Sequence, residues 1–185
     1  HETYKFKNQW FSPEEVSSDN GKDFYLKEDR NKNVVVGPSE SMSKSKKNTI
    51  DPEIMVENFG ADSVRFFILS DSPPEKDIQW SDQGMLASFN FIQKFWNLNL
   101  ELTNKINSKT NSNTTKDDLN NEISIFTNQI IKKITSNLEN FHYNVIIATL
   151  NELYTFLNKL NHSQVLKFEN FREHYIKIII LIKEI

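Results

Sequence analysis

Three lysines and three serines gather in one short run, Ser41-Met42-Ser43-Lys44-Ser45-Lys46-Lys47-Asn48. A lysine on a polar loop brings a point charge without rigid geometry, and neighbouring hydroxyls add hydrogen-bond donors, so this run is suited to meeting phosphate groups. Composition alone equally allows a solvated loop that binds nothing, since charged runs commonly form solvated surface. The order of the residues, rather than their composition, decides between these two interpretations.

A β-prone segment enters this loop and a capped helix leaves it. Val34-Val35-Val36 precedes the loop, and Asp51-Pro52 follows it. Asp51 is suited to the N-cap of a helix, Pro52 to its first position, and Gly60 to a left-handed residue just past its end. The loop is therefore predicted to connect a strand to a helix.

The residues before the loop are predicted to contain little helix. Phe24-Tyr25-Leu26 and Val34-Val35-Val36 are aromatic and β-branched clusters separated by the charged, turn-prone stretch 27–33, which predicts a hairpin or two short strands. Ser12 and Pro13 could cap and begin a single helical turn.

The residues after position 61 are predicted to be helical. Asp62 could cap a short helix that ends before Pro73-Pro74, and Ser81 could cap a long one. On the long helix, apolar residues at steps of three or four predict a core-facing stripe of Met85, Phe89, Ile92 and Trp96, widened by Leu86 and Phe95. Similar stripes predict three more helices, over residues 122–138, 143–160 and 168–185. A polar loop at 107–118 is predicted to separate them from the first long helix. The predicted fold class is mainly α: a small β-containing N-terminal segment, then an antiparallel helix bundle.

Composition narrows the possible functions. The net charge of −3 gives no global basic field of the kind that dedicated nucleic-acid binders carry. The absence of cysteine excludes disulfides and thiolate metal sites, and we expect no metal site. The longest apolar run, Ile178–Ile182, is too short to span a bilayer, so we expect no membrane partner and a cytoplasmic location. The helical pattern still runs at residue 185 without a cap, and we expect the chain to be part of a larger protein.

Several stretches resemble one enzyme family. The run from Ser41 resembles the Lys-Met-Ser-Lys-Ser signature loop of class I aminoacyl-tRNA synthetases. Residues 51–65 resemble the helix pair that follows this loop in the leucyl, isoleucyl and valyl enzymes. Residues 72–82, and the opening residues 1–5 with 10–16, resemble the bacterial leucyl enzymes specifically. These stretches occur in the family's order, and the resemblance covers roughly residues 1–100.

The resemblance implies a reaction and its participants. Class I synthetases activate an amino acid with ATP and then transfer it to tRNA, so the implied substrates are leucine, ATP and tRNA(Leu), with Mg²⁺ bound through ATP. Lys44 takes the catalytic role by resemblance, and the implied ATP-binding loop is Ser41, Met42, Ser43, Lys44 and Ser45. Ser41 stands where the signature has its first lysine, and Lys46 and Lys47 either compensate for it or are ordinary solvated side chains.

Smaller expectations follow for single residues. Met42 is expected to be a hydrophobic anchor of the loop, and Asn48 to be structural rather than catalytic. Arg65 is expected to pair with a neighbouring acid. Five lysines on the helices could meet tRNA phosphates, although single surface lysines usually do nothing specific: Lys94, Lys105, Lys132, Lys133 and Lys159.

The resemblance also divides the chain and leaves alternatives open. Residues 1–50 would form the end of the catalytic domain, and residues 81–185 an anticodon-binding-type helix bundle. Residues 51–80 would connect these two parts of a monomeric enzyme. The alternatives are a sibling isoleucyl, valyl or methionyl synthetase, or a noncatalytic helical RNA-binding module. Because the family's His-x-Gly-His motif and nucleotide-binding first half are absent from this sequence, the isolated chain is predicted to be catalytically silent.

Overall fold

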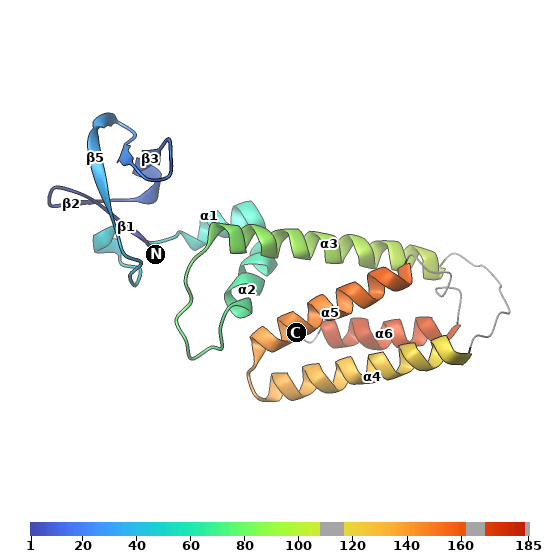
Figure 1. Cartoon of the computed structure of the whole chain (residues 1–185). Coiled ribbons are helices and arrows are strands. Elements are labelled where there is room, and N and C mark those ends of the chain that lie inside the picture. The colour runs from blue at the N-terminus through green and yellow to red at the C-terminus, as the bar shows by residue number, and fades with distance from the viewer. Residues whose placement is uncertain (108–116, 162–168, 184–185) are drawn as a thin grey trace. The chain divides into compact units, whose positions relative to one another are not determined.

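The computed structural model describes residues 1–107, 117–161 and 169–183. They form two compact units, His1–Ala61 with Gln79–Asp82, and Asp62–Ile78 with Gln83–Ile185. The first unit contains all the described strands and the second most of the helices, as Figure 1 shows. The predicted fold class, mainly α with a small β-containing N-terminal segment and an antiparallel bundle, is confirmed.

The first unit is built on a five-stranded antiparallel sheet. Its strands lie in the order β2-β1-β5-β4-β3 and are β1 (Thr3–Phe6), β2 (Gln9–Phe11), β3 (Val16–Ser18), β4 (Phe24–Leu26) and β5 (Asp29–Gly37). The predicted hairpin is confirmed, because Phe24 on β4 pairs with Val34 on β5. β5 lies at the centre of the sheet, and its end, Gly37, pairs with Thr3 on β1.

Strands β1, β2 and β3 were not predicted. Each spans only three or four residues, which is too short for alternation of apolar and polar side chains to be distinctive. Together the strands bury a small core of Tyr4, Val16, Leu26 and Val34. Burial and a hydrogen bond to Glu2 raise the pKa of Tyr4 to about 12, so its hydroxyl stays a neutral donor within this core.

Helix α1 (Pro52–Phe59) begins and ends at the predicted residues. The Asp51 carboxylate accepts a hydrogen bond from the Glu53 N–H (2.9 Å), which satisfies one of the free donors of the first turn. Gly60 follows with φ of +78°, a backbone conformation that residues other than glycine disfavour. The helix after the loop is therefore fixed at both ends by local sequence.

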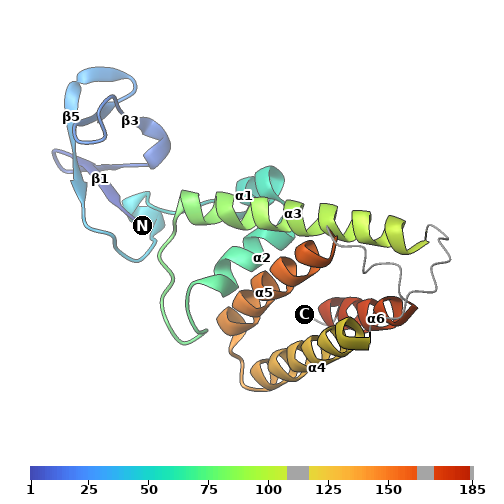
Figure 2. The ribbon, with the colours of Figure 1, turned by 45° about the vertical axis from the view of Figure 1, so that its right-hand side comes forward.

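The second unit contains α2 (Ala61–Ser70) and the predicted bundle. The bundle helices are α3 (Asp82–Asn107), α4 (Asp117–Glu139), α5 (Tyr143–Asn161) and α6 (Glu169–Lys183). Consecutive bundle helices reverse direction in both Figure 1 and Figure 2, as an antiparallel bundle requires. Most of the predicted loop at 107–118 lies outside the described residues. No described helix has the length and apolar character that crossing a membrane requires.

The bundle core draws on all four of these helices. Its buried residues include Leu98 and Leu102 on α3, Ile130 and Ile134 on α4, Leu153 and Leu157 on α5, and Phe171 and Ile178 on α6. Helix α2 joins through Phe66, which stacks on Phe91 of α3 at 4.9 Å between ring centroids. On α2, Arg65 pairs with Asp62 (2.9 Å), which confirms the expected partner.

The buried face of α3 differs from the predicted stripe. Met85 is buried as predicted, but Trp96 is 64% exposed, so its assignment to the core was wrong. Helix α3 carries apolar residues around much of its circumference, and the face that packs includes Phe95, which was predicted, and Phe91, which lay outside the predicted stripe. The two rings stack on one another, and Phe91 also stacks on Phe66 of α2 and meets the edge of Tyr154 on α5. No pattern within α3 could indicate the contacts with Phe66 and Tyr154.

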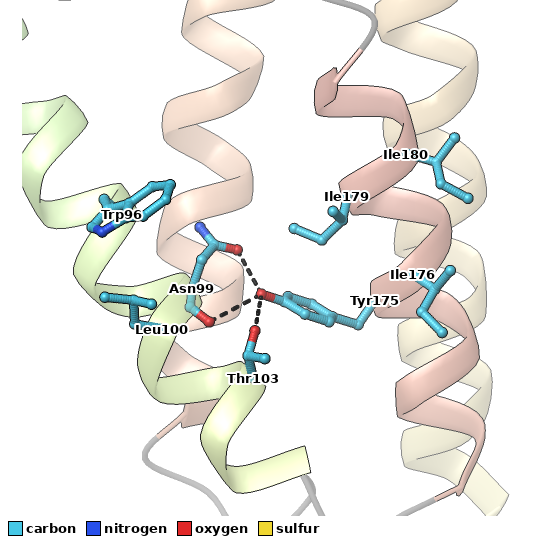
Figure 3. Close-up of a pocket in the computed structure, with 8 residues that line it drawn as sticks. All are labelled: Trp96, Asn99, Leu100, Thr103, Tyr175, Ile176, Ile179 and Ile180. Carbon is cyan, nitrogen blue, oxygen red and sulfur yellow. Dashed lines mark hydrogen bonds between the residues drawn. The ribbon is translucent and has the colours of Figure 1, made fainter. Parts of the chain in front are cut away.

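Trp96 lies on a groove between α3 and α6 that encloses about 380 Å³ (Figure 3). Its lining is almost wholly apolar and consists of Trp96, Asn99, Leu100, Thr103, Tyr175, Ile176, Ile179 and Ile180. At the groove's base the Tyr175 hydroxyl donates to Asn99 Oδ1 (2.8 Å) and lies 3.5 Å from Thr103 Oγ1. The hydroxyl thus links α6 to α3 by a polar contact.

Replacing Tyr175 by phenylalanine is expected to destabilise the bundle by about 1–2 kcal/mol, because Asn99 loses a partly buried hydrogen-bond donor while the ring packing is kept. Urea unfolding followed by the helical circular-dichroism signal measures the change. Tyr25→Phe is the matched control, since the Tyr25 hydroxyl bonds Asp19 at an exposed site. Equal effects of the two substitutions would contradict the prediction.

Candidate functional site

The candidate loop leaves the sheet at the end of β5. A side chain at Gly37 would collide with the Thr3 hydroxyl, so glycine lets β5 approach β1 closely there. Beyond Gly37, the Glu40 N–H donates to the His1 carbonyl (3.0 Å), which continues the pairing of the two segments. The loop therefore starts from a base that is already hydrogen-bonded to the sheet.

Asn48 closes the loop from within. Its side chain is fully buried, and its Oδ1 accepts from the Ser43 N–H (2.8 Å). Its Nδ2 donates to the carbonyls of His1 (3.2 Å) and Ser41 (3.4 Å). One amide side chain thus joins the end of the loop to its beginning and to the segment before β1, which confirms that Asn48 is structural.

The tip of the loop is a single 3-10 turn, η2 (Lys44–Lys46). The Ser43 and Ser45 hydroxyls lie 2.8 Å apart across this turn and bond to each other. Lys47 ends the turn in a left-handed conformation (φ of +52°), and its N–H donates to the Lys44 carbonyl (3.2 Å). The position of the Lys44 backbone is therefore tied directly to that of Lys47.

The three loop lysines have different surroundings. The Lys46 ammonium forms an ion pair with Glu40, and the Lys47 ammonium lies 3.2 Å from the Glu15 carboxylate. Lys44 is exposed, and its side chain makes no hydrogen bond or ion pair within the part of the chain that the structure describes. Because Lys46 and Lys47 already face carboxylates, Lys44 is the loop lysine best placed to meet an added anion.

Glu15 was not singled out from the sequence. It ends the short turn η1 (Pro13–Glu15), where its carboxylate accepts the Ser12 N–H (2.7 Å) in a capping box. That bond and the nearby Lys47 ammonium lower the pKa of Glu15, which keeps the carboxylate charged. The spacing of Ser12 and Glu15 is a recognisable capping signal, but nothing local points to a partner 32 residues away.

The remaining predicted loop residues, Ser41 and Met42, are both exposed. Ser41 contributes its carbonyl to loop closure, and its side chain is exposed. Met42 is 42% exposed, so the expectation that it anchors the loop was wrong. The polar side chain of Asn48 closes the loop instead.

This arrangement can bind an anion but supplies no acid–base pair of its own. An exposed ammonium and two hydroxyls on a short loop match phosphate oxygens, which accept charge-assisted hydrogen bonds. Among the described residues no group of three or more acidic, histidine or cysteine side chains could hold a metal ion.

The helical lysines offer fewer free charges than the sequence suggested. Three of them already have partners: Lys105 donates to Asn161, Lys133 pairs with Glu152 and Lys159 lies 3.7 Å from Glu122. Lys94 and Lys132 are exposed, and no ion pair of theirs is found within the described ranges. The groove between α3 and α6 carries no charged side chain.

Comparisons with known proteins agree with the geometry. Residues 34–81 match the family model of tRNA synthetases class I (I, L, M and V). The leucine–tRNA ligase of Orientia tsutsugamushi (strain Boryong) is 38% identical over 92% of this chain and 20% of its own length. That of Rickettsia africae (strain ESF-5) is 43% identical over 83% of this chain and 18% of its own.

One solved structure gives the same result. The crystal structure of the ternary complex of Agrobacterium radiobacter K84 agnB2 LeuRS with tRNA and LeuAMS aligns with a TM-score of 0.61 at 25% identity. The alignment covers 74% of this chain and 18% of that one. These matches confirm the resemblance found in the sequence. The chain spans about a fifth of the length of the curated relatives it matches.

Proposed function

This chain is homologous to a segment of the leucine–tRNA ligases, and on that premise we propose that it serves as the signature-loop segment and helical bundle of such an enzyme. The whole enzyme would join leucine to tRNA(Leu) in two steps, through leucyl-adenylate. The observation that carries the proposal is the Ser41–Asn48 loop, closed by a buried asparagine, with Lys44 as its exposed and unengaged ammonium.

In the first step the leucine carboxylate attacks the α-phosphorus of ATP. A bond forms between a carboxylate oxygen and phosphorus, and the bond to the bridging oxygen breaks, so pyrophosphate leaves with the electron pair. Negative charge grows on the leaving phosphates as that bond breaks. A Lys44 ammonium that meets these oxygens more closely in the transition state than in the ground state lowers the barrier.

The remaining participants are assigned by the chemistry of the same step. Mg²⁺ would enter bound to the ATP phosphates, since the described residues offer it no cage. The bundle formed by α3–α6 would brace tRNA as an anticodon-binding-type domain, with residues 1–50 closing the catalytic domain and residues 51–80 connecting the two. The enzyme would act as a monomer in the cytoplasm.

The amino-acid specificity is tested by pyrophosphate exchange. We expect the complete protein that carries this segment to exchange labelled pyrophosphate into ATP when leucine is added. Valine is expected to support less exchange because it lacks one methylene of leucine, which in an apolar pocket is worth about 1–3 kcal/mol. Isoleucine and methionine are expected to support less because their side chains differ from leucine's in branching and therefore in shape. The 185-residue chain alone is expected to give no exchange.

Each alternative outcome has its own meaning. Exchange that depends on isoleucine, valine or methionine instead would assign the segment to a sibling enzyme of the same family. Exchange with none of them, in a complete protein that still binds tRNA, would support a noncatalytic RNA-binding module. Exchange by the isolated chain would contradict the role of the missing parts.

A further inference from the structure

Glu15 occupies a fixed position at the edge of the sheet. Its carbonyl accepts the Lys27 N–H (2.9 Å), and its carboxylate accepts the Ser12 N–H and lies within 3.1 Å of the Ser12 hydroxyl. A residue held by its backbone and by its side chain has little conformational freedom left to lose when it binds a partner. Glu15 is therefore a pre-organised acceptor for the Lys47 ammonium.

Lys47 joins this acceptor to the tip of the loop. Its ammonium contacts both Glu15 carboxylate oxygens (3.3 and 3.2 Å) and lies 5.8 Å from the centre of the Phe11 ring. Its backbone N–H donates to the Lys44 carbonyl, and its left-handed conformation ends the 3-10 turn. A continuous set of contacts thus runs from the sheet through Lys47 to the backbone of Lys44.

We propose that Glu15 is a positioning residue for Lys44: by holding Lys47 against the sheet, it fixes the turn from which the Lys44 ammonium reaches the phosphates of ATP. This inference rests on the proposed function. It also accounts for Lys47, which the family resemblance left either compensating for Ser41 or merely solvated. In the structure its ammonium faces Glu15.

The size of the effect follows from the exposure of the pair. The Lys47 and Glu15 side chains are 46% and 43% exposed, so solvent screens their attraction and the pair contributes modestly. Its role is to select one loop conformation among several, which changes the fraction of molecules with Lys44 correctly placed. A loss of about two- to five-fold in rate is the scale expected for an exposed pair.

The first experiment is Glu15→Gln in the complete synthetase. Glutamine keeps a carbonyl acceptor for the Ser12 N–H, as capping boxes allow, but removes the charge that holds Lys47. We expect kcat for leucine-dependent exchange to fall about two- to five-fold while KM for ATP is unchanged, since Lys44 acts in the transition state. Glu14→Gln is the matched control, because Glu14 is exposed and makes no hydrogen bond or ion pair among the described residues.

A double-mutant cycle tests whether Glu15 acts through Lys44. In a Lys44→Ala background, Glu15→Gln is expected to cause no further loss, because the positioned group is gone. A merely structural role of Glu15 would instead give losses that multiply.

The outcomes separate the inference from the function on which it rests. If Lys44→Ala lowers exchange but Glu15→Gln does not, or if the two losses multiply, the positioning role is wrong and the proposed function stands. If Lys44→Ala leaves exchange unchanged, Lys44 has no catalytic role, and both its proposed part in the reaction and the positioning role of Glu15 are wrong.

Discussion

Replacing Lys44 by alanine in the complete protein is expected to lower leucine-dependent pyrophosphate exchange by about one to two powers of ten. The figure corresponds to losing one charge-assisted hydrogen bond, worth about 1.5–3 kcal/mol, in the transition state alone. Because the lost interaction is made as the leaving phosphates gain charge, kcat should fall while KM for ATP changes little. Steady-state exchange kinetics with varied ATP separate the two parameters.

Two further variants make the Lys44 result interpretable. Lys44→Arg keeps the charge but replaces a compact ammonium by a planar guanidinium, so an intermediate loss is expected. Lys22→Ala removes an exposed lysine from the same unit and is expected to leave exchange unchanged. Thermal unfolding and tRNA binding should be the same for all three proteins. A rate unchanged in Lys44→Ala would remove Lys44 from the mechanism.

Replacing Asn48 by alanine is expected to open the loop. The substitution leaves the Ser43 N–H and the Ser41 carbonyl without the Asn48 side chain, while the His1 carbonyl keeps only its bond from the Glu40 N–H, at a cost of about 2–3 kcal/mol. Native-state hydrogen exchange of the Ser43 amide reads this directly, with a loss of protection of about 30- to 150-fold. In the complete synthetase, kcat should fall as well, because the η2 turn that carries Lys44 is no longer held by Asn48.

Asn33→Ala is the matched control for this experiment. Asn33 is an exposed asparagine on β5 in the same unit, and no side-chain hydrogen bond of it occurs among the described residues. Its replacement should leave the Ser43 amide protected. Retained protection in Asn48→Ala would mean that the backbone alone closes the loop, and the role assigned to Asn48 would then be wrong.

Local rules predicted those parts of the fold that depend on neighbouring residues. Asp51 caps α1 as predicted, since an N-cap bond needs only a side chain and an N–H two residues later. The hairpin of β4 and β5 also followed from composition and spacing. The stripe on α4 was predicted for the same reason, because Ile123, Ile130 and Ile134 repeat at helical steps and are buried.

Partners distant in sequence were not predictable in this way. On α3 the period of 3.6 residues allowed two apolar faces, and rings contributed by other helices select the one that contains Phe91 and expose Trp96. The apolar side chain of Met42 is of a type that could anchor the loop, but polar contacts close the loop instead. In both cases a residue's type was compatible with more than one environment.

The order of residues in the loop, by itself, determined the candidate chemistry: a lysine among hydroxyls between a strand and a capped helix, in a pattern shared with one enzyme family. Only the tertiary structure decided which lysine is available, because Glu40 and Glu15 neutralise Lys46 and Lys47 through space. Attraction between charges depends on the distance between them and not on their separation along the chain. A pairing across 32 residues therefore leaves no mark on local sequence, although it gives Lys47 a carboxylate partner that Lys44 lacks among the described residues.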